Sequence, residues 1–133
     1  MKKVHPLHPA SLQKPSGYTH GFLVGGGRTL YIAGQTAASL GPIPSDDFVD
    51  QFDRALQALL EVVKEAGGKP EDLMTFTIFV SSVDEYLASL EPLGERYRKR
   101  MGRHYPCMAL LEISRFVNPR AKVEIQAVAV LDG

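Results

Sequence analysis

The sequence predicts an α+β fold in which a mixed β-sheet carries two helices packed on one face. The prediction rests on several short runs rich in β-branched and aromatic residues, one long segment with helical periodicity, and a second helical segment before the last two β-rich runs. In chain order these segments give β-β-α-β-α-β-β. A length of 133 residues without a linker or a low-complexity stretch predicts a single domain over residues 1–133.

The first two predicted strands are expected to form a hairpin. Residues 17–24 and 29–36 are rich in β-forming side chains and flank the cluster Gly25-Gly26-Gly27. A phosphate-binding loop would require a helix directly after the glycines, whereas a strand follows here. Gly34, inside the second strand, indicates a bulge or a close approach by a ligand or by backbone. Residues 1–16 hold three prolines and are expected to form an arm or an edge segment.

The clearest helix is predicted to run from a cap at Ser45 or Asp46 to about Ala66, before Gly67-Gly68. Its apolar residues recur at helical spacing, so they form a stripe that packs on the sheet. They are Phe48, Phe52, Ala55, Leu56, Leu59 and Val63. Residues 73–80 are then expected to be a central strand, because apolar side chains occupy both faces near its end.

The second helical segment is predicted to begin as a short turn that ends at Ser89. A helix with Pro92 in its first turn then continues to Met101. The basic residues near its end are typical of a solvated helix face with cations close to the negative end of the dipole. They are Arg96, Arg98, Lys99, Arg100 and Arg103. A nucleic-acid surface is the alternative, but 15 basic and 15 acidic residues cancel, so a nucleic-acid partner is not expected.

The composition also bounds the compartment. Cys107 is the one cysteine, so no intrachain disulfide is possible, and a reducing compartment is favoured. No apolar run follows Met1-Lys2-Lys3, and no stretch approaches the roughly 20 apolar residues of a membrane span. We therefore expect a cytoplasmic protein with no membrane partner. The four histidines are scattered without a cluster of cysteines or carboxylates, so no metal site is expected.

Two apolar runs near the C-terminus, residues 107–113 and 121–131, complete the sheet. Each carries carboxylate or amide groups inside a strand that otherwise has the composition of a buried one, among them Glu112 and Glu124. This pair of strands is therefore the predicted location of any small-molecule site. Cys107 is a candidate nucleophile there, although an unpaired cysteine more often serves as a small buried hydrophobe.

Short motifs along the chain occur in a characteristic order and spacing, although none is specific by itself. They are Gly17-Tyr18-x-x-Gly21, Tyr31-Ile32-Ala33-Gly34-Gln35, Gln51 with Ala55-Leu56, Val80-x-x-Val83-Asp84-x-Tyr86, Pro106, Glu112-x-x-Arg115 and Lys122-Val123-Glu124-Ile125-Gln126-Ala127. Through them residues 18–130 resemble the reactive intermediate deaminase (RidA/YjgF-like) family. The resemblance implies a chorismate-mutase-like fold and a homotrimer with small-molecule clefts between subunits.

The resemblance also implies a reaction, the hydrolysis of enamines or imines derived from amino acids to 2-oxo acids and ammonia. Such a reaction needs a cation to bind the substrate carboxylate, a carboxylate to position water, and an apolar cleft. No cofactor is expected, because the imine carbon is already electrophilic. Glu124 falls on the family's catalytic carboxylate position, and Tyr18, Gly34 and Tyr86 fall on positions that line the cleft.

The expected cation is missing from its usual place. The family motif begins Pro-x-Arg, whereas this chain has Pro106-Cys107-Met108, so Met108 stands where the arginine is expected. Cys107 and Met108 are expected to contact the substrate, but methionine carries no charge and donates no hydrogen bond. Arg115 and Arg120 are the remaining candidates for the cation.

Two functions from different classes follow. One is a deaminase with a non-standard substrate range, and the alternative is a non-catalytic trimeric protein that binds a metabolite in the same clefts. A regulatory protein that acts through its surface, including the ribonuclease role named for some family members, is a third hypothesis, which the balanced charge disfavours.

Overall fold

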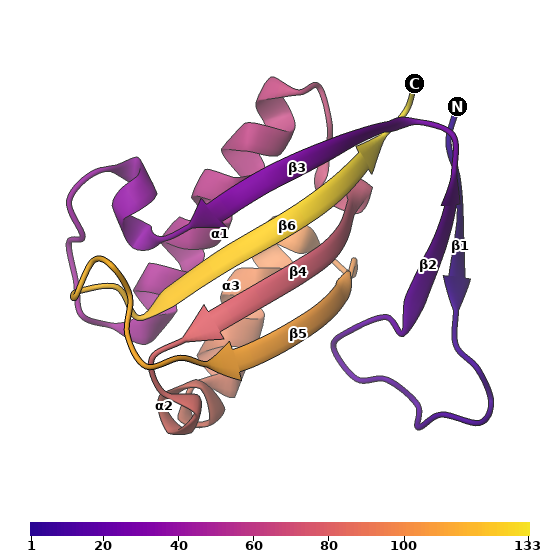
Figure 1. Cartoon of the computed structure of the whole chain (residues 1–133). Helices are drawn as coiled ribbons and strands as arrows, with labels where there is room; N and C mark the ends of the chain where they lie inside the picture. The colour runs from indigo at the N-terminus through magenta and orange to yellow at the C-terminus, as the bar shows by residue number, and fades with distance from the viewer.

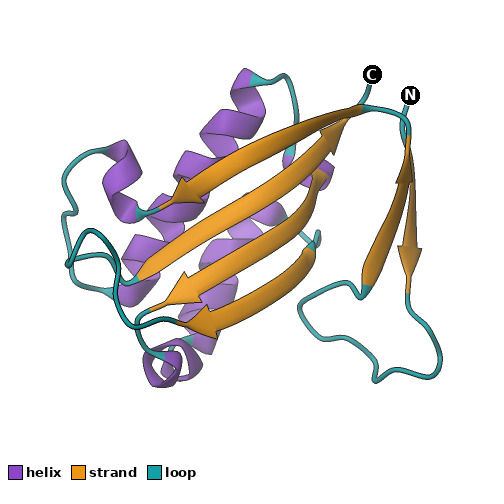
Figure 2. Cartoon of the chain, in the orientation of Figure 1, coloured by secondary structure: helices purple, strands orange, loops and turns teal.

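The computed structural model describes all 133 residues and has a main sheet with helices on one face only (Figure 1, Figure 2). The sheet has four strands in the order β3-β6-β4-β5. They are β3 (Arg28–Gln35), β4 (Leu73–Val80), β5 (Cys107–Glu112) and β6 (Val123–Leu131). The two long helices, α1 (Phe48–Glu65) and α3 (Leu90–Met101), lie on the same side. The predicted α+β class and mixed sheet are confirmed.

The strand directions explain why both helices lie on one side. β6 lies between β3 and β4 and is antiparallel to both, so β3 and β4 run in the same direction. β4 and β5 are direct parallel neighbours. Each pair of parallel strands needs a crossover connection, and α1 and α3 provide the two connections. Because crossovers of this kind share one hand, both helices cover the same face.

The N-terminal strands form a separate two-stranded ribbon, so the predicted hairpin between residues 17–24 and 29–36 is wrong. β2 (Gly21–Gly25) pairs with β1 (Lys3–Leu7), which lies in the segment expected to be an arm, and β3 pairs with β6. Gly26 and Gly27 have φ values of 75° and 86°, which turn the chain sharply between β2 and β3. A Cβ on Gly27 would overlap the carbonyl oxygen of Leu131, so this bend requires glycine.

The ribbon is fastened to the rest of the protein at both of its ends. The Lys2 ammonium group pairs with the buried Asp72 carboxylate and donates to the carbonyl of Val130. At the other end, the Thr19 N–H donates to the carbonyl of Pro106 at 3.2 Å. The segment before β2 is therefore held against the start of β5.

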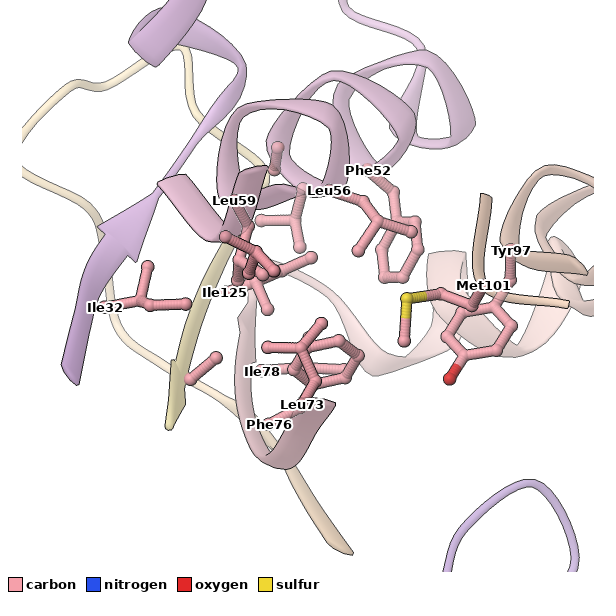
Figure 3. Close-up of a cluster of buried hydrophobic side chains, with 14 of the residues drawn as sticks. Ile32, Phe52, Leu56, Leu59, Leu73, Phe76, Ile78, Tyr97, Met101 and Ile125 are labelled. Carbon is pink, nitrogen blue, oxygen red and sulfur yellow. The ribbon is translucent and has the colours of Figure 1, made fainter. Parts of the chain in front are cut away.

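The core lies between the sheet and the two helices (Figure 3). Leu56 and Leu59 of α1 meet Phe76 of β4 and Ile125 of β6, and all four side chains are almost completely buried. Each buried side chain of this size contributes roughly 1.5–3 kcal/mol to folding. The helical stripe predicted from the sequence is therefore the face of α1 that packs on the sheet.

Helix α1 begins one or two residues later than predicted. The carboxylate of Asp47 accepts the N–H of Asp50 at 2.9 Å and caps the helix, so the predicted cap at Ser45 or Asp46 is wrong. Ser45 instead accepts the N–H of Asp47 at 2.9 Å and fixes the turn before the helix. The short helix α2 (Val83–Ala88) ends before Ser89, and Pro92 lies in the first turn of α3, as predicted.

Part of the basic run on α3 joins the two long helices. Arg96 pairs with Asp50 and Asp53, and Arg100 pairs with Asp53 through bonds of 2.6 and 3.1 Å. The hydrogen bond from Arg100 is the main reason that the pKa of Asp53 lies below its ordinary value. These two arginines therefore hold α3 against α1.

None of the helices is both long and apolar enough to cross a bilayer.

Gln51 ties the start of α1 to the loop before β6. Its side chain is fully buried, and its amide group donates to the carbonyls of Ser45 and Arg120, both at 3.0 Å. Its oxygen accepts the N–H of Lys122 at 2.8 Å. One side chain thus satisfies three backbone groups in two loops that have no regular secondary structure.

We predict that Gln51→Leu destabilises the fold by about 2–4 kcal/mol, because it leaves these buried backbone groups without partners. Chemical denaturation at one fixed protein concentration measures the effect. The control is Gln57→Leu on the same helix, because the Gln57 oxygen accepts only one long bond of 3.4 Å from Arg100. Equal losses in the two variants would contradict the assigned role of Gln51.

Candidate functional site

The main sheet separates the predicted site residues into two groups. On β6, Val123, Ile125 and Ala127 are buried under the helices, so Glu124 points to the opposite side, which we call the open face. On β5, Met108 lies beside the buried Phe76 and therefore points toward the helices. Within one chain, Glu124 and Met108 therefore lie on opposite faces of the sheet.

The helix side holds a cavity of about 360 Å³ at the edge strand β5, which we call the β5 pocket. Ten of its fourteen lining residues are hydrophobic, and three of the predicted site residues, Tyr18, Tyr86 and Met108, are among them. The other lining residues are Ser16, Gly17, Phe52, Ile78, Leu90, Leu93, Gly94, Tyr97, Arg98, Tyr105 and Leu110. A mostly apolar hollow with a few polar groups is the usual form of a small-molecule site.

Hydrogen bonds and stacking fix one wall of the β5 pocket. The rings of Tyr97 and Tyr105 stack with centroids 5.2 Å apart, and the Tyr97 hydroxyl donates to the carbonyl of His104 at 2.6 Å. Burial raises the pKa of Tyr97 far above its usual value, so its hydroxyl remains a donor. The Thr19 hydroxyl donates to the carbonyl of Tyr105 at 2.5 Å and places Tyr18 at the pocket.

On the open face, Gly34 makes room for Glu124. A Cβ at Gly34 would lie 2.6 Å from Oε2 and 2.9 Å from Cγ of Glu124. The pairing of β3 with β6 also shifts between Ile32 and Gln35, so Gly34 lies in an irregularity of the strand. The sequence predicted a bulge or a close approach here, and the group that approaches is the Glu124 side chain. This carboxylate accepts no hydrogen bond and forms no ion pair within the chain.

Cys107 also lies on the open face, because it neighbours Met108 on the same strand. Partial burial raises the pKa of its thiol, although the N–H groups of Phe22 and of Cys107 itself act in the opposite direction. A raised pKa keeps the thiol protonated, whereas a cysteine nucleophile needs the thiolate. The surroundings of Cys107 therefore favour the thiol over the thiolate.

The two arginines proposed as substitutes for the missing cation lie outside the β5 pocket. Arg120 donates to the carbonyl of Ile43 at 2.8 Å and pairs with Asp46 at 3.2 Å. Arg115 lines a different hollow beside Ser81. The cation that does line the β5 pocket is Arg98, which the sequence placed within an undivided basic run. Arg98 follows Gly94 by four residues and Leu90 by eight, and both are apolar positions on α3. This spacing is the sequence signal that identifies Arg98 as a residue of the pocket.

The family model described as Endoribonuclease L-PSP matches residues 10–131. The chain belongs to this family. Its solved relatives include a Rid family protein of unknown function, YyfB from Yersinia pestis, with a TM-score of 0.81 and 26% identity over 96% of this chain and 98% of that one. YjgF from E. coli has a TM-score of 0.65 and 26% identity over 85% of this chain and 87% of that one.

Curated relatives of this Endoribonuclease L-PSP family protein include a protein named as a deaminase and proteins named as RutC family members. The human protein named 2-iminobutanoate/2-iminopropanoate deaminase is 24% identical over 105 residues, which cover 77% of this chain and 73% of that one. A RutC family protein of Pyrococcus abyssi is 24% identical over 119 residues, which cover 87% of this chain and 88% of that one. The resemblance to RidA/YjgF-like proteins inferred from the motifs is thus confirmed.

We predict that Gly34→Ala is costly only while Glu124 keeps its full side chain. In a double-mutant cycle, Gly34→Ala and Glu124→Ala should show a coupling of about 0.5–3 kcal/mol, because Glu124→Ala removes the atoms that the new methyl group meets. Denaturation of the four proteins at equal concentration measures it. Gly25→Ala is the control, since a Cβ there meets nothing within 4 Å. Additive effects would contradict the contact between Gly34 and Glu124.

Proposed function

We propose that this RidA-like protein forms a homotrimer whose small-molecule clefts lie between subunits. In this proposal the β5 pocket of one chain receives Glu124 from the neighbouring chain. The opposite directions of Met108 and Glu124 support the arrangement, because no single chain can present both groups to one ligand. A ring of three chains gives every pocket a neighbour's carboxylate.

The uncovered side of the sheet supports self-association. Helices cover one face, while the open face carries Tyr31, which is 79% exposed, and Leu111, which is 47% exposed. Exposed apolar side chains on an open sheet face are typical of a surface that another chain covers. The same packing would remove water from the surroundings of Glu124, which strengthens its electrostatic effect on a reacting group.

We further propose that the protein hydrolyses an enamine or imine intermediate derived from an amino acid. Glu124 accepts a proton from water as the water oxygen bonds to the imine carbon. The carbon–nitrogen bond then breaks after the proton reaches the nitrogen, so the products are ammonia and a carbonyl compound. The observation that carries the proposal is the unpaired Glu124 carboxylate held in the space left by Gly34.

The lining of the β5 pocket supports substrates that are larger and more apolar than the small imino acids. Met108 fills the place where the motif has an arginine and offers an adaptable apolar surface. Phe52, Leu93 and Tyr105 extend that surface. A substrate with an apolar body gains more binding free energy from these walls than the small imine derived from alanine does.

The charge distribution and the single cysteine support a class of ligand and a cellular compartment. Charges cancel over the chain, and Arg96 and Arg100 are engaged with acidic groups of α1, which supports a small-molecule ligand over a nucleic acid. A single cysteine and the metabolic chemistry proposed here support a cytoplasmic location.

The deaminase proposal predicts accelerated imine hydrolysis. An amino-acid oxidase can generate imines from phenylalanine, leucine or alanine in the presence of the protein, and the release of ammonia and 2-oxo acid is then compared with the uncatalysed rate. Glu124→Gln should lower the enzymatic rate about 10²–10⁴-fold, because it removes the general base. Met108→Arg should shift the preference toward the alanine-derived imine.

The matched control is Glu112→Gln. Glu112 accepts the N–H of Val83 at 2.9 Å, and glutamine retains an oxygen for that bond, so this variant should keep the wild-type rate. If the wild type does not exceed the free hydrolysis rate with any of the three imines, the deaminase proposal is wrong. The non-catalytic metabolite-binding function would then be the one that remains.

A further inference from the structure

Arg98 is the single charged residue among those that line the β5 pocket. Its guanidinium group forms no hydrogen bond and no ion pair within the chain. The arginines two positions before and after it behave differently, because Arg96 and Arg100 both pair with acidic groups of α1. The structure thus leaves Arg98 and Lys99 of α3 unpaired, and of these two only Arg98 lines the β5 pocket.

Gly94 allows Arg98 to take this position. The two residues are four apart on α3, so their side chains share one helix face, and both line the β5 pocket. A Cβ at Gly94 would lie only 2.8 Å from Nη1 of Arg98. The guanidinium group therefore lies over the glycine. Glycine within a helix costs stability relative to alanine, so its presence here has a structural use.

Two further polar groups at the pocket are free to bind a ligand. The hydroxyls of Tyr18 and Tyr86 form no hydrogen bond within the chain, in contrast to the Tyr97 hydroxyl, which is bound to a carbonyl. A guanidinium group and phenolic hydroxyls are all hydrogen-bond donors, and a carboxylate accepts from both. The remaining walls are apolar or aromatic.

We propose that Arg98 binds the carboxylate of the ligand and that the β5 pocket selects carboxylic acids with an aromatic or branched apolar body. This inference rests on the proposed function in that it names the substrate class of the same cleft. Arg98 then supplies from α3 the charge that Met108 cannot supply from β5. The apolar body of the ligand lies against Met108 and the stacked rings of Tyr97 and Tyr105.

Phenylacetate and phenylacetamide form a suitable pair of probes, since they share a body and differ in charge. The chain has no tryptophan, and four of its five tyrosines, Tyr18, Tyr86, Tyr97 and Tyr105, line the β5 pocket, so tyrosine fluorescence reports binding directly. The wild type should bind phenylacetate at least about tenfold more tightly than phenylacetamide. The preference should decrease as salt concentration rises.

Arg98→Met should weaken phenylacetate binding about 10- to 100-fold and leave phenylacetamide binding within about twofold. Gly94→Ala should weaken phenylacetate binding as well, because the added methyl group displaces the guanidinium group. Lys99→Met is the control, since it removes the adjacent cation, which does not line the pocket, and it should bind like the wild type. Circular dichroism of each variant establishes that it is folded.

The proposal is overturned if the wild type does not bind phenylacetate, if it binds both probes equally, or if Arg98→Met and Lys99→Met have equal effects. The two proposals can fail separately. If phenylacetate binding depends on Arg98 as expected and the wild type hydrolyses no imine, the deaminase proposal fails while the role of Arg98 stands. If imines are hydrolysed and Arg98→Met changes neither binding nor KM, the role of Arg98 fails alone.

Discussion

The structure depends on the alternation of side chains along the strands of a sheet that helices cover on one side only. On β6, every second residue from Val123 to Leu131 is buried in the core, and this requirement forces Glu124 to the open face. The same rule on β5 turns Met108 toward the helices. A one-residue slip in either strand would exchange the two faces, so the core itself fixes where the polar groups point.

Much of this architecture is predictable from the sequence because it is local. The stripe of α1, the break at Ser89 and the close approach at Gly34 each depend on residue types at short spacings. Strand pairing is not local. The preference of β2 for β1 over β3 depends on a proline-containing arm and on the bend at Gly26 and Gly27, which no pattern within a single strand records.

The candidate site shows the same division. Motif positions identify Tyr18, Gly34, Tyr86 and Glu124 as a set, but only the register of β4 with β5 and β6 shows that they fall into two groups on opposite faces. Likewise, the basic run on α3 looks uniform in the sequence. The acidic groups of α1 divide it, because they pair with Arg96 and Arg100 and leave Arg98 at the β5 pocket.

The central claim is that one site contains groups from two chains, and mixed assemblies test it most directly. One chain carries Glu124→Gln and keeps its pocket, and the other carries Met108→Trp, which fills the pocket, and keeps Glu124. Each should be inactive alone in imine hydrolysis. After random mixing by co-refolding, about one quarter of the sites combine an intact pocket with an intact Glu124, so activity should recover to about that fraction of the wild type. Mixtures that remain as inactive as the two parents, beside an active wild type refolded in the same way, would contradict a site shared between chains.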